Sequence, residues 1–229
     1  MWAYRAQALF AGARVVFDDR LRVDLPMLAE NQHVLPVTVD ARALAGVTRI
    51  VLFADLNPIP VAIDCVLLAA EPFVATRIKL DQRTPVRGAA LTADGVWHVA
   101  GDWVDAAGGG CSAPPVSRVR GDWADHLGEM RGAVWAVRTA TRVRLSLRHP
   151  MDTGLVENIP VYNIEELVVS DGAGSDLVRM TLYASVSEDP AFTLLLTPTG
   201  AGPIKVSARD TGGLVFSGTL PAPAAGARA

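Results

Sequence analysis

Apolar and polar residues alternate along most of the chain in short segments that are separated by turn residues. A period of two is typical of β-strands, and this pattern begins at about residue 21. The strands predicted before residue 105 are Leu21–Leu25, Val34–Asp40, Val47–Asp55, Pro60–Ala69, Phe73–Leu80, Val86–Thr92 and Val96–Val104. Those predicted after residue 128 are Thr141–Arg148, Val161–Val169, Leu177–Val186, Phe192–Thr197, Pro203–Ala208 and Leu214–Leu220. Because no helix alternates with these strands, the pattern predicts an all-β protein with two β-sandwich domains.

The predicted strands are bounded by recognisable turn and loop signals. Asp94-Gly95 is a two-residue signal for a tight hairpin turn. Residues 210–213, with the sequence Asp-Thr-Gly-Gly, are expected to turn the last hairpin. Residues 55–60 contain two prolines and must form a loop, because proline cannot donate to a central ladder.

The domain organisation follows from these patterns and from changes in composition. Met1–Gly12 has apolar residues near helical spacing and ends at a glycine that can adopt the left-handed cap. We expect a helical segment at residues 1–20, a first sandwich at 21–105, a flexible arm and linker at 106–128, and a second sandwich at 129–220. The tail at residues 221–229 is rich in alanine and proline and is expected to be disordered.

Composition excludes several classes of protein. The 229 residues carry a formal net charge of -3, so a broadly basic surface for non-specific nucleic-acid binding is not expected. Mean hydropathy is +0.27, but the uninterrupted apolar runs are far shorter than the roughly 20 residues of a membrane span. Two cysteines are too few for a disulfide-rich scaffold or a four-thiolate zinc site.

Motifs for catalysis and cofactor binding are missing from the sequence. It contains no G-x-S-x-G elbow, phosphate-binding loop, H-E-x-x-H motif or G-x-G-x-x-G turn. The four histidines, His33, His98, His126 and His149, lack the spacing of metal ligands and are interpreted as surface or loop residues. We therefore predict no cofactor, no metal and no enzymatic activity of the chain's own.

Cys111 stands out because of the sequence around it. The segment Ala106–Pro115, here called the arm, reads AAGGGCSAPP, and nothing in it is large enough to bury a thiol. We therefore expect an exposed thiol on a flexible arm, which would reach at most about 33–36 Å when extended and about 16–19 Å as a coil. The alternatives are a disulfide partner and an incidental linker residue. Cys65 is interpreted as a buried strand thiol, with a bond to Cys111 as the competing interpretation.

Several motifs resemble the SoxY and SoxZ proteins of thiosulfate oxidation. The first block resembles SoxY at residues 25–39, at residues 55–60 and 74–78, and at the terminal Gly109-Gly110-Cys111. The second block resembles SoxZ at residues 149–155, which read HPMDTGL, and at Phe192 and residues 210–213. In this order, the motifs resemble fused SoxYZ-like carriers associated with quinoprotein dehydrogenases.

This resemblance implies a fold, a function and a site. It implies immunoglobulin-like sandwiches that pair with each other in the periplasm, with any signal peptide already removed from this chain. It implies that Cys111 carries a sulfur group, thiosulfate-derived or similarly thiol-reactive, with Gly109 and Gly110 as the hinge of the arm. The partners would be sulfur-oxidation enzymes or a quinoprotein dehydrogenase system, and His149 would serve in a turn or an interdomain contact.

The arm departs from the family pattern in one respect. In the separate SoxY subunits the arm is a free carboxyl-terminal tail with glycines after the cysteine, whereas here Ser112-Ala113-Pro114-Pro115 leads into a second domain. The arm is therefore tethered at both ends, and its two prolines stiffen the return. Two hypotheses follow: a non-catalytic carrier that uses Cys111, and an interaction module that binds a periplasmic dehydrogenase with Cys111 structural or disulfide-linked.

Overall fold

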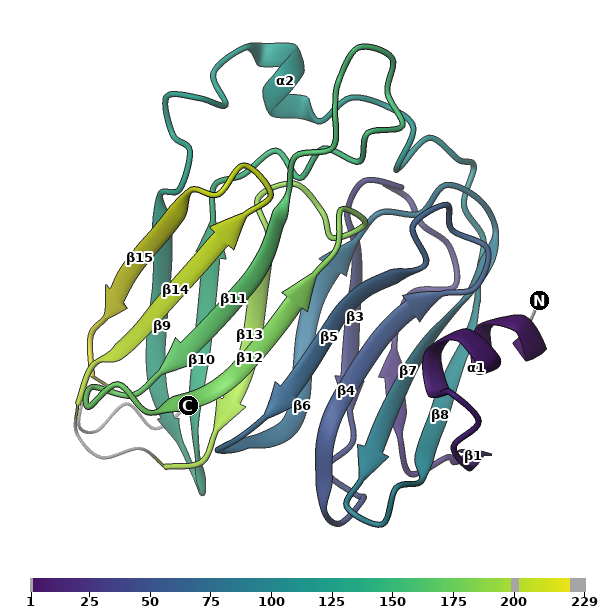
Figure 1. Ribbon diagram of the computed structural model, residues 1–229, viewed down its shortest axis with the longest axis vertical. Coiled ribbons are helices and arrows are strands. Elements are labelled where there is room, and N and C mark those ends of the chain that lie inside the picture. Colours follow the sequence, from purple (N-terminus) through teal and green to yellow (C-terminus); the bar gives the residue numbers. More distant parts are fainter. Residues whose placement is uncertain (1, 199–201, 223–229) are drawn as a thin grey trace.

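The computed structural model describes residues 2–198 and 202–222, and it consists almost entirely of β-strands (Figure 1). The elements of the first half are α1 (Trp2–Phe10), β1 (Val15–Phe17), β2 (Arg22–Asp24), β3 (Leu35–Asp40), β4 (Val47–Ala54), β5 (Val61–Leu67), β6 (Ala70–Ile78), β7 (Thr84–Thr92) and β8 (Trp97–Val104). Helix α2 (Val116–Arg120) follows in the linker. The second half contains β9 (Met130–Val137), β10 (Ala140–Leu147), β11 (Ile164–Ser170), β12 (Asp176–Leu182), β13 (Ala191–Leu196), β14 (Ile204–Asp210) and β15 (Val215–Leu220). The predicted all-β sandwich fold is confirmed, whereas the expected disorder of the tail concerns residues that lie mostly outside the described part.

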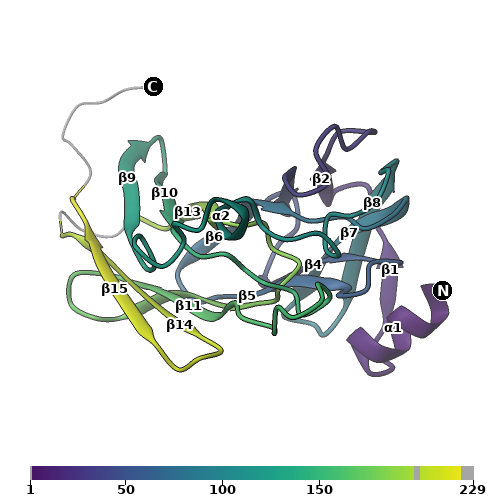
Figure 2. The ribbon, with the colours of Figure 1, turned by 90° about the horizontal axis from the view of Figure 1, so that it is seen from above.

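The strands form two sheets that pack face to face, as the view from above shows (Figure 2). One sheet has nine strands in the order β1-β8-β7-β4-β5-β12-β11-β14-β15. The other has six strands in the order β2-β3-β6-β13-β10-β9. Both sheets therefore contain strands of both halves.

The two halves meet through strand pairing in each sheet. In the nine-stranded sheet β5 pairs antiparallel with β12, so that Cys65 lies opposite Met180. In the six-stranded sheet β6 pairs antiparallel with β13, and Ala75 lies opposite Thr193. The halves are thus joined edge to edge by backbone hydrogen bonds as well as by the linker, a feature that the hydrophobic pattern did not predict.

The space between the sheets is filled by a single apolar cluster that draws on both halves. Its fully buried members include Ile63 and Val74 from the first half and Leu167 and Phe192 from the second. These residues occupy alternate positions of their strands, as a sandwich with one buried face per sheet requires. Cys65 belongs to the same cluster and is 0% exposed, in agreement with its interpretation as a buried strand thiol.

The amino-terminal segment forms the predicted helix and one strand that was not predicted. Helix α1 ends at Phe10, and the two residues that follow, Ala11 (φ +47°) and Gly12 (φ +80°), both adopt the left-handed backbone conformation. Phe10 is buried against the outer face of the nine-stranded sheet, where it contacts Trp97. Strand β1 then pairs parallel with β8. Within the described residues neither helix has the length and apolar character needed to cross a membrane.

Candidate functional site

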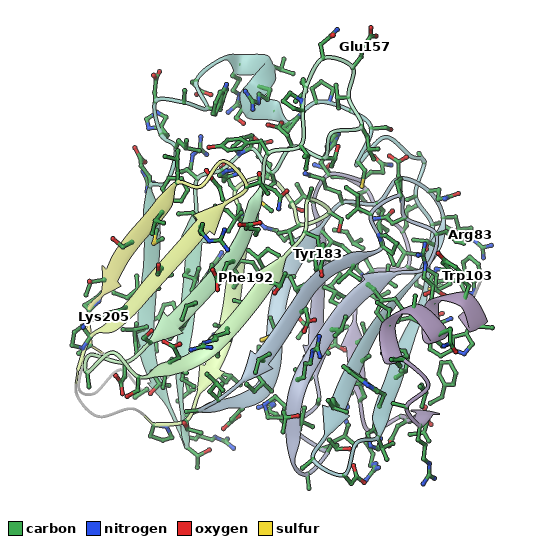
Figure 3. The ribbon with its side chains drawn as sticks, viewed as in Figure 1. Arg83, Trp103, Glu157, Tyr183, Phe192 and Lys205 are labelled. Atoms are coloured by element: carbon green, nitrogen blue, oxygen red, sulfur yellow. The ribbon has the colours of Figure 1, made fainter. Side chains whose placement is uncertain are left out.

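The arm crosses one end of the sandwich, between the end of β8 and helix α2 (Figure 1). Its root is fixed at Asp105, whose backbone pairs with Leu28 in a β-bridge. The Asp105 carboxylate accepts a hydrogen bond from Arg83 at 2.6 Å, and the Arg83 guanidinium lies 4.5 Å from the centre of the Trp103 ring. Figure 3 shows Arg83 and Trp103 together at this edge of the molecule. The arm therefore begins from a firmly held position.

The structure buries Cys111 in the interior of the protein. Its exposure is 1%, so the prediction of an exposed thiol is wrong for this conformation. The reason is that the residues that bury it come from other parts of the chain, between 30 and 54 positions away. The sequence around Cys111 carries no trace of these neighbours.

Asp81 holds the arm at Cys111 and at the residue that follows it. The Oδ1 atom of Asp81 accepts hydrogen bonds from the backbone N–H of Cys111 at 3.1 Å and of Ser112 at 3.1 Å. The same atom accepts a third hydrogen bond from the Ser112 hydroxyl at 2.9 Å. Hydrogen bonds to a carboxylate are stronger than those between neutral groups, so Asp81 contributes strongly to the docked position of the arm.

The thiol itself lies against Asn57 and the backbone of Lys79. Asn57 is buried, and its side-chain nitrogen lies 3.8 Å from the Cys111 sulfur. The same nitrogen donates to the Lys79 carbonyl at 2.7 Å, and the Cys111 sulfur lies 3.9 Å from that carbonyl oxygen. Asn57 also accepts a hydrogen bond from the N–H of Asp81 at 2.9 Å. It therefore orients both the thiol site and the residue that holds the arm.

Lys79 connects the thiol site to the second half. Its side chain is buried, and the ammonium group donates to the Met151 carbonyl and, at 3.0 Å, to the Ala184 carbonyl. Burial lowers the pKa of Lys79 to about 8, although the negative groups around it, including Asp152, oppose this shift. The ammonium thus fastens two loops of the second half beside Cys111.

The motif HPMDTG of the second half closes over the arm. Its Thr153 hydroxyl donates to the Cys111 carbonyl at 2.6 Å. Its Asp152 is buried and forms an ion pair with Arg118 of α2. Met151 adopts φ +53°, which turns its carbonyl toward Lys79. Residues of the SoxY-like and SoxZ-like motifs therefore meet at Cys111.

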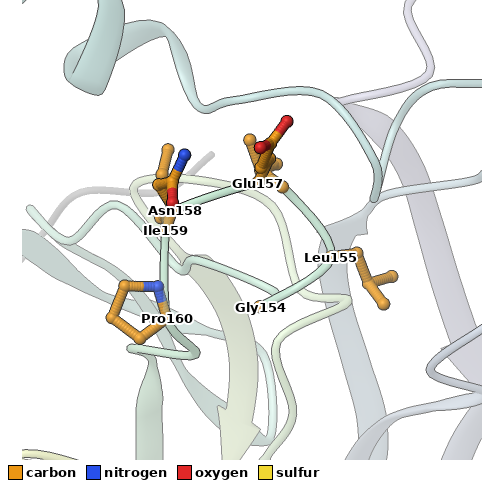
Figure 4. A pocket seen from close by; sticks show the side chains of 7 residues that line it. Gly154, Leu155, Glu157, Asn158, Ile159 and Pro160 are labelled. Carbon is orange, nitrogen blue, oxygen red and sulfur yellow. The ribbon is translucent and has the colours of Figure 1, made fainter.

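The loop that follows Thr153 borders an open hollow of about 580 Å³ (Figure 4). The side chains of Leu155, Glu157 and Pro160 point in different directions, so they do not converge on one ligand position. Figure 3 shows Glu157 at the outer tip of this loop. Across residues 2–198 and 202–222, no group of three or more His, Cys, Asp or Glu side chains is arranged to hold a metal ion.

His149 has a structural position in the second half. Its Nδ1 atom accepts the N–H of Met151 at 3.1 Å, and its ring lies 4.6 Å from the Tyr162 ring, measured between centroids. The Nε2 atom lies 3.8 Å from the carboxylate of Asp210. Burial lowers the pKa of His149 to about 4, with Asp210 opposing the shift. A neutral ring is required for the bond from Met151, so His149 supports the turn that carries Thr153.

We expect the protein to lose stability as the pH falls from about 6.5 to about 4, partly because of His149. In this window the unfolded chain binds a proton that the folded His149 does not bind, so acid favours unfolding. The loss reaches about 3 kcal/mol at the lower end, since one pKa unit corresponds to about 1.4 kcal/mol. Urea unfolding at several pH values should show a shallower decline for His149→Asn. The control His126→Asn changes an exposed histidine and should keep the steep decline of the wild type. Equal declines of the free energy of unfolding in both variants would contradict the role of His149.

The two glycines before Cys111 have different structural requirements. Gly109 has φ +87° and open space around the position of a side chain. At Gly110 a Cβ atom would lie 2.2 Å from the Leu80 carbonyl oxygen and 2.3 Å from that of Gln32. Gly110 is therefore required for a close approach of two backbones, a role that the sequence analysis did not foresee. Their action as a hinge stays a prediction.

Both cysteines are free thiols, and each is buried. The competing interpretation of a Cys65–Cys111 bond therefore does not describe this structure. Burial raises the pKa of Cys111 to about 12, although the nearby Lys79 ammonium acts in the opposite direction. The docked thiol is protonated at neutral pH and is a poor nucleophile, because the thiolate is the reactive form.

The fold and the site define a class: a protein of two β-sandwich halves that share their sheets and together enclose the thiol of the arm, Cys111, at one end of the sandwich. Comparison with protein families matches residues 6–111 to "Sulfur oxidation protein SoxY" and residues 132–221 to "Sulphur oxidation protein SoxZ". The chain therefore belongs to the SoxY and SoxZ families, joined in one polypeptide as a fused SoxYZ-like protein. The SoxY match ends at Cys111 itself.

The similarity to individual proteins is low in the following comparisons. No curated protein matches the chain. The sulfur carrier protein SoxY from Chlorobium limicola f thiosulfatophilum is 22% identical, covering 45% of this chain and 94% of its own, with a TM-score of 0.41. A β-glycosidase from Bacteroides vulgatus is 10% identical, covering 89% of this chain and 25% of its own, with a TM-score of 0.23.

Proposed function

We propose that this protein is a non-catalytic carrier of sulfur oxidation, which holds a sulfur group covalently on Cys111 and presents it to partner enzymes in the periplasm. One observation supports this assignment above the others. Asn57 and Asp81 of the SoxY half and Thr153 of the SoxZ half all contact Cys111, the last residue of the SoxY match. A cysteine that both halves position, through its thiol, its N–H and its carbonyl, is well suited to be the attachment point for a cargo.

The chemistry of loading requires a partner. Joining the Cys111 thiol to the outer sulfur of thiosulfate forms one S–S bond and releases one proton and two electrons. A partner enzyme must therefore accept the two electrons. The arm must also leave its docked position for loading, because the docked thiol is 1% exposed and its pKa is raised to about 12.

Intact mass spectrometry of the protein taken from its own host tests the carrier function. We expect mass additions that a reductant removes and that map to the peptide containing Cys111. The Cys111→Ser variant should carry none of them, while Cys65→Ser should keep them. A Cys111 that is unmodified under sulfur-oxidising growth and unreactive toward thiosulfate with its partner enzymes would exclude this function.

The burial of Cys111 favours a second candidate function. In that case the chain binds a periplasmic quinoprotein dehydrogenase as an interaction module, and Cys111 fills a structural position. The two functions differ in cells, because a module would keep full activity after Cys111→Ser whereas a carrier would lose it. Thiol counting before and after denaturation, together with non-reducing electrophoresis, would show whether any fraction of Cys111 is disulfide-linked.

A further inference from the structure

Four consecutive backbone amides of the arm are hydrogen-bonded, and three of them donate to residues outside the arm. The N–H groups of Gly110, Cys111, Ser112 and Ala113 donate to the Leu80 carbonyl, to Asp81 (twice) and to the Gly109 carbonyl, all at 3.1 Å. Coil segments rich in glycine ordinarily leave such groups to water. The docked arm of this protein is therefore an ordered element with its own set of bonds.

Two of the four amides, together with the Ser112 hydroxyl, depend on one side chain. Asp81 lies immediately after the segment that carries Lys79 and Leu80, and its Oδ1 atom receives all three bonds. The hydroxyl of Ser112 adds a bond to Asp81 that a residue without a polar side chain could not donate. The arm continues into helix α2, so it is tethered at both ends and cannot swing as a free tail.

The docked position has no room for a group on the sulfur. The Cys111 sulfur is packed against the Asn57 side chain at 3.8 Å and the Lys79 carbonyl at 3.9 Å. Cys111 is 1% exposed, so added atoms would have to displace these neighbours. Close-packed interiors do not accept extra atoms without rearrangement.

Building on the proposed carrier function, we propose that Asp81 and Ser112 form a latch that keeps the unloaded arm closed, and that a group on the Cys111 sulfur opens it. The unloaded thiol is protected from stray oxidants and thiols in the closed position. The loaded arm stays outside, where a partner enzyme can reach it. Asp81 is a positioning residue in this device and takes no part in bond formation.

Residue-resolved hydrogen exchange of the intact chain tests the latch. Iodoacetamide alkylates Cys111 during opening fluctuations: the sulfur–carbon bond forms, iodide leaves and the thiol proton passes to the buffer. This label is the probe for a loaded arm, and peptide mapping confirms that Cys111 carries it. We expect the amides of Cys111 and Ser112 to exchange at least about tenfold faster in the labelled protein than in the unlabelled one, because their bonds to a charged group are lost.

Variants separate the latch from general stability. Unlabelled Asp81→Ala should show the same acceleration at these two amides, Asp81→Asn should recover part of the protection, and Asp105→Asn at the root of the arm should leave it unchanged. If Asp81→Ala fails to fold, Ser112→Gly tests the latch through the hydroxyl bond alone and should show a smaller acceleration at the same two amides. Equal exchange in the wild type and Asp81→Ala, or full protection in the labelled protein, would overturn the latch. Because the label is added in vitro, these results do not depend on what Cys111 carries in the host.

Discussion

The first half of the chain, produced alone as residues 1–121, is expected not to fold into a stable monomer. Without the second half, β5 and β6 lose their partners β12 and β13 and become exposed edges. Both strands carry apolar side chains that belong to the cluster shared by the two halves. Long unpaired edges with apolar faces pair with other chains, so we expect oligomers or insoluble protein. Size-exclusion chromatography with circular dichroism would show the outcome.

Co-production with residues 122–229 is the control for this experiment. The two fragments should form a soluble one-to-one complex with the β-sheet signal of the full chain. The full chain should in turn unfold in one cooperative transition, with tryptophan fluorescence and circular dichroism changing together. A soluble, cooperatively folded monomer of residues 1–121 would show that the shared sheets are dispensable.

Replacing Gly110 by alanine is expected to release the arm and make Cys111 reactive. The new Cβ atom would lie 2.2 Å from the Leu80 oxygen and 2.3 Å from the Gln32 oxygen, and both are backbone atoms. Neither can move easily, because Leu80 also donates its N–H to Gln32 at 2.8 Å. We expect alkylation of Cys111 by iodoacetamide to become at least about a hundredfold faster, which corresponds to about 2.8 kcal/mol in the opening equilibrium.

Gly109→Ala is the matched control, because it changes the neighbouring glycine in open space. Its positive φ imposes a cost of about 1–2 kcal/mol on any residue with a side chain, but no clash. The acceleration should therefore be smaller than in Gly110→Ala, and peptide mapping should assign the label to Cys111 rather than Cys65. Alkylation of Gly110→Ala at the wild-type rate would contradict the assigned close approach.

Most of the strands could be predicted because their burial alternates. In β10, for example, Val143, Leu145 and Leu147 are buried, and Arg142 and Arg144 are exposed, as the pattern requires. Strand β1 was missed because its three residues, Val-Val-Phe, are all apolar and show no alternation. Strand β9 was missed because it contains Gly132 and buries only Val134 at the sheet edge.

Within the candidate site, the sequence singled out Cys111 and the two glycines before it, but not the residues that surround the thiol. Cys111 was identified from its neighbours in sequence and from the family motif, but the residues that bury it lie far away along the chain. A signal for Lys79 was present: it is one of only two lysines, and it follows the apolar strand that ends at Ile78. Period-two alternation places such a residue on either face of a sheet, and its burial depends on the carbonyls of the second half. The pairing of the two halves within each sheet likewise depends on the backbone edges of β5, β6, β12 and β13, and the pattern of side chains does not encode which edges pair.

The linker between β8 and β9 has a thermodynamic consequence for the shared sheets. Two separate subunits associate by mass action, so dilution drives them apart. Here β5 and β12 belong to one chain, and once separated the halves would stay at an effective concentration on the order of millimolar because the linker joins them. The halves therefore remain paired however dilute the protein becomes, and the proposed carrier would keep its partner domain while it diffuses between enzymes.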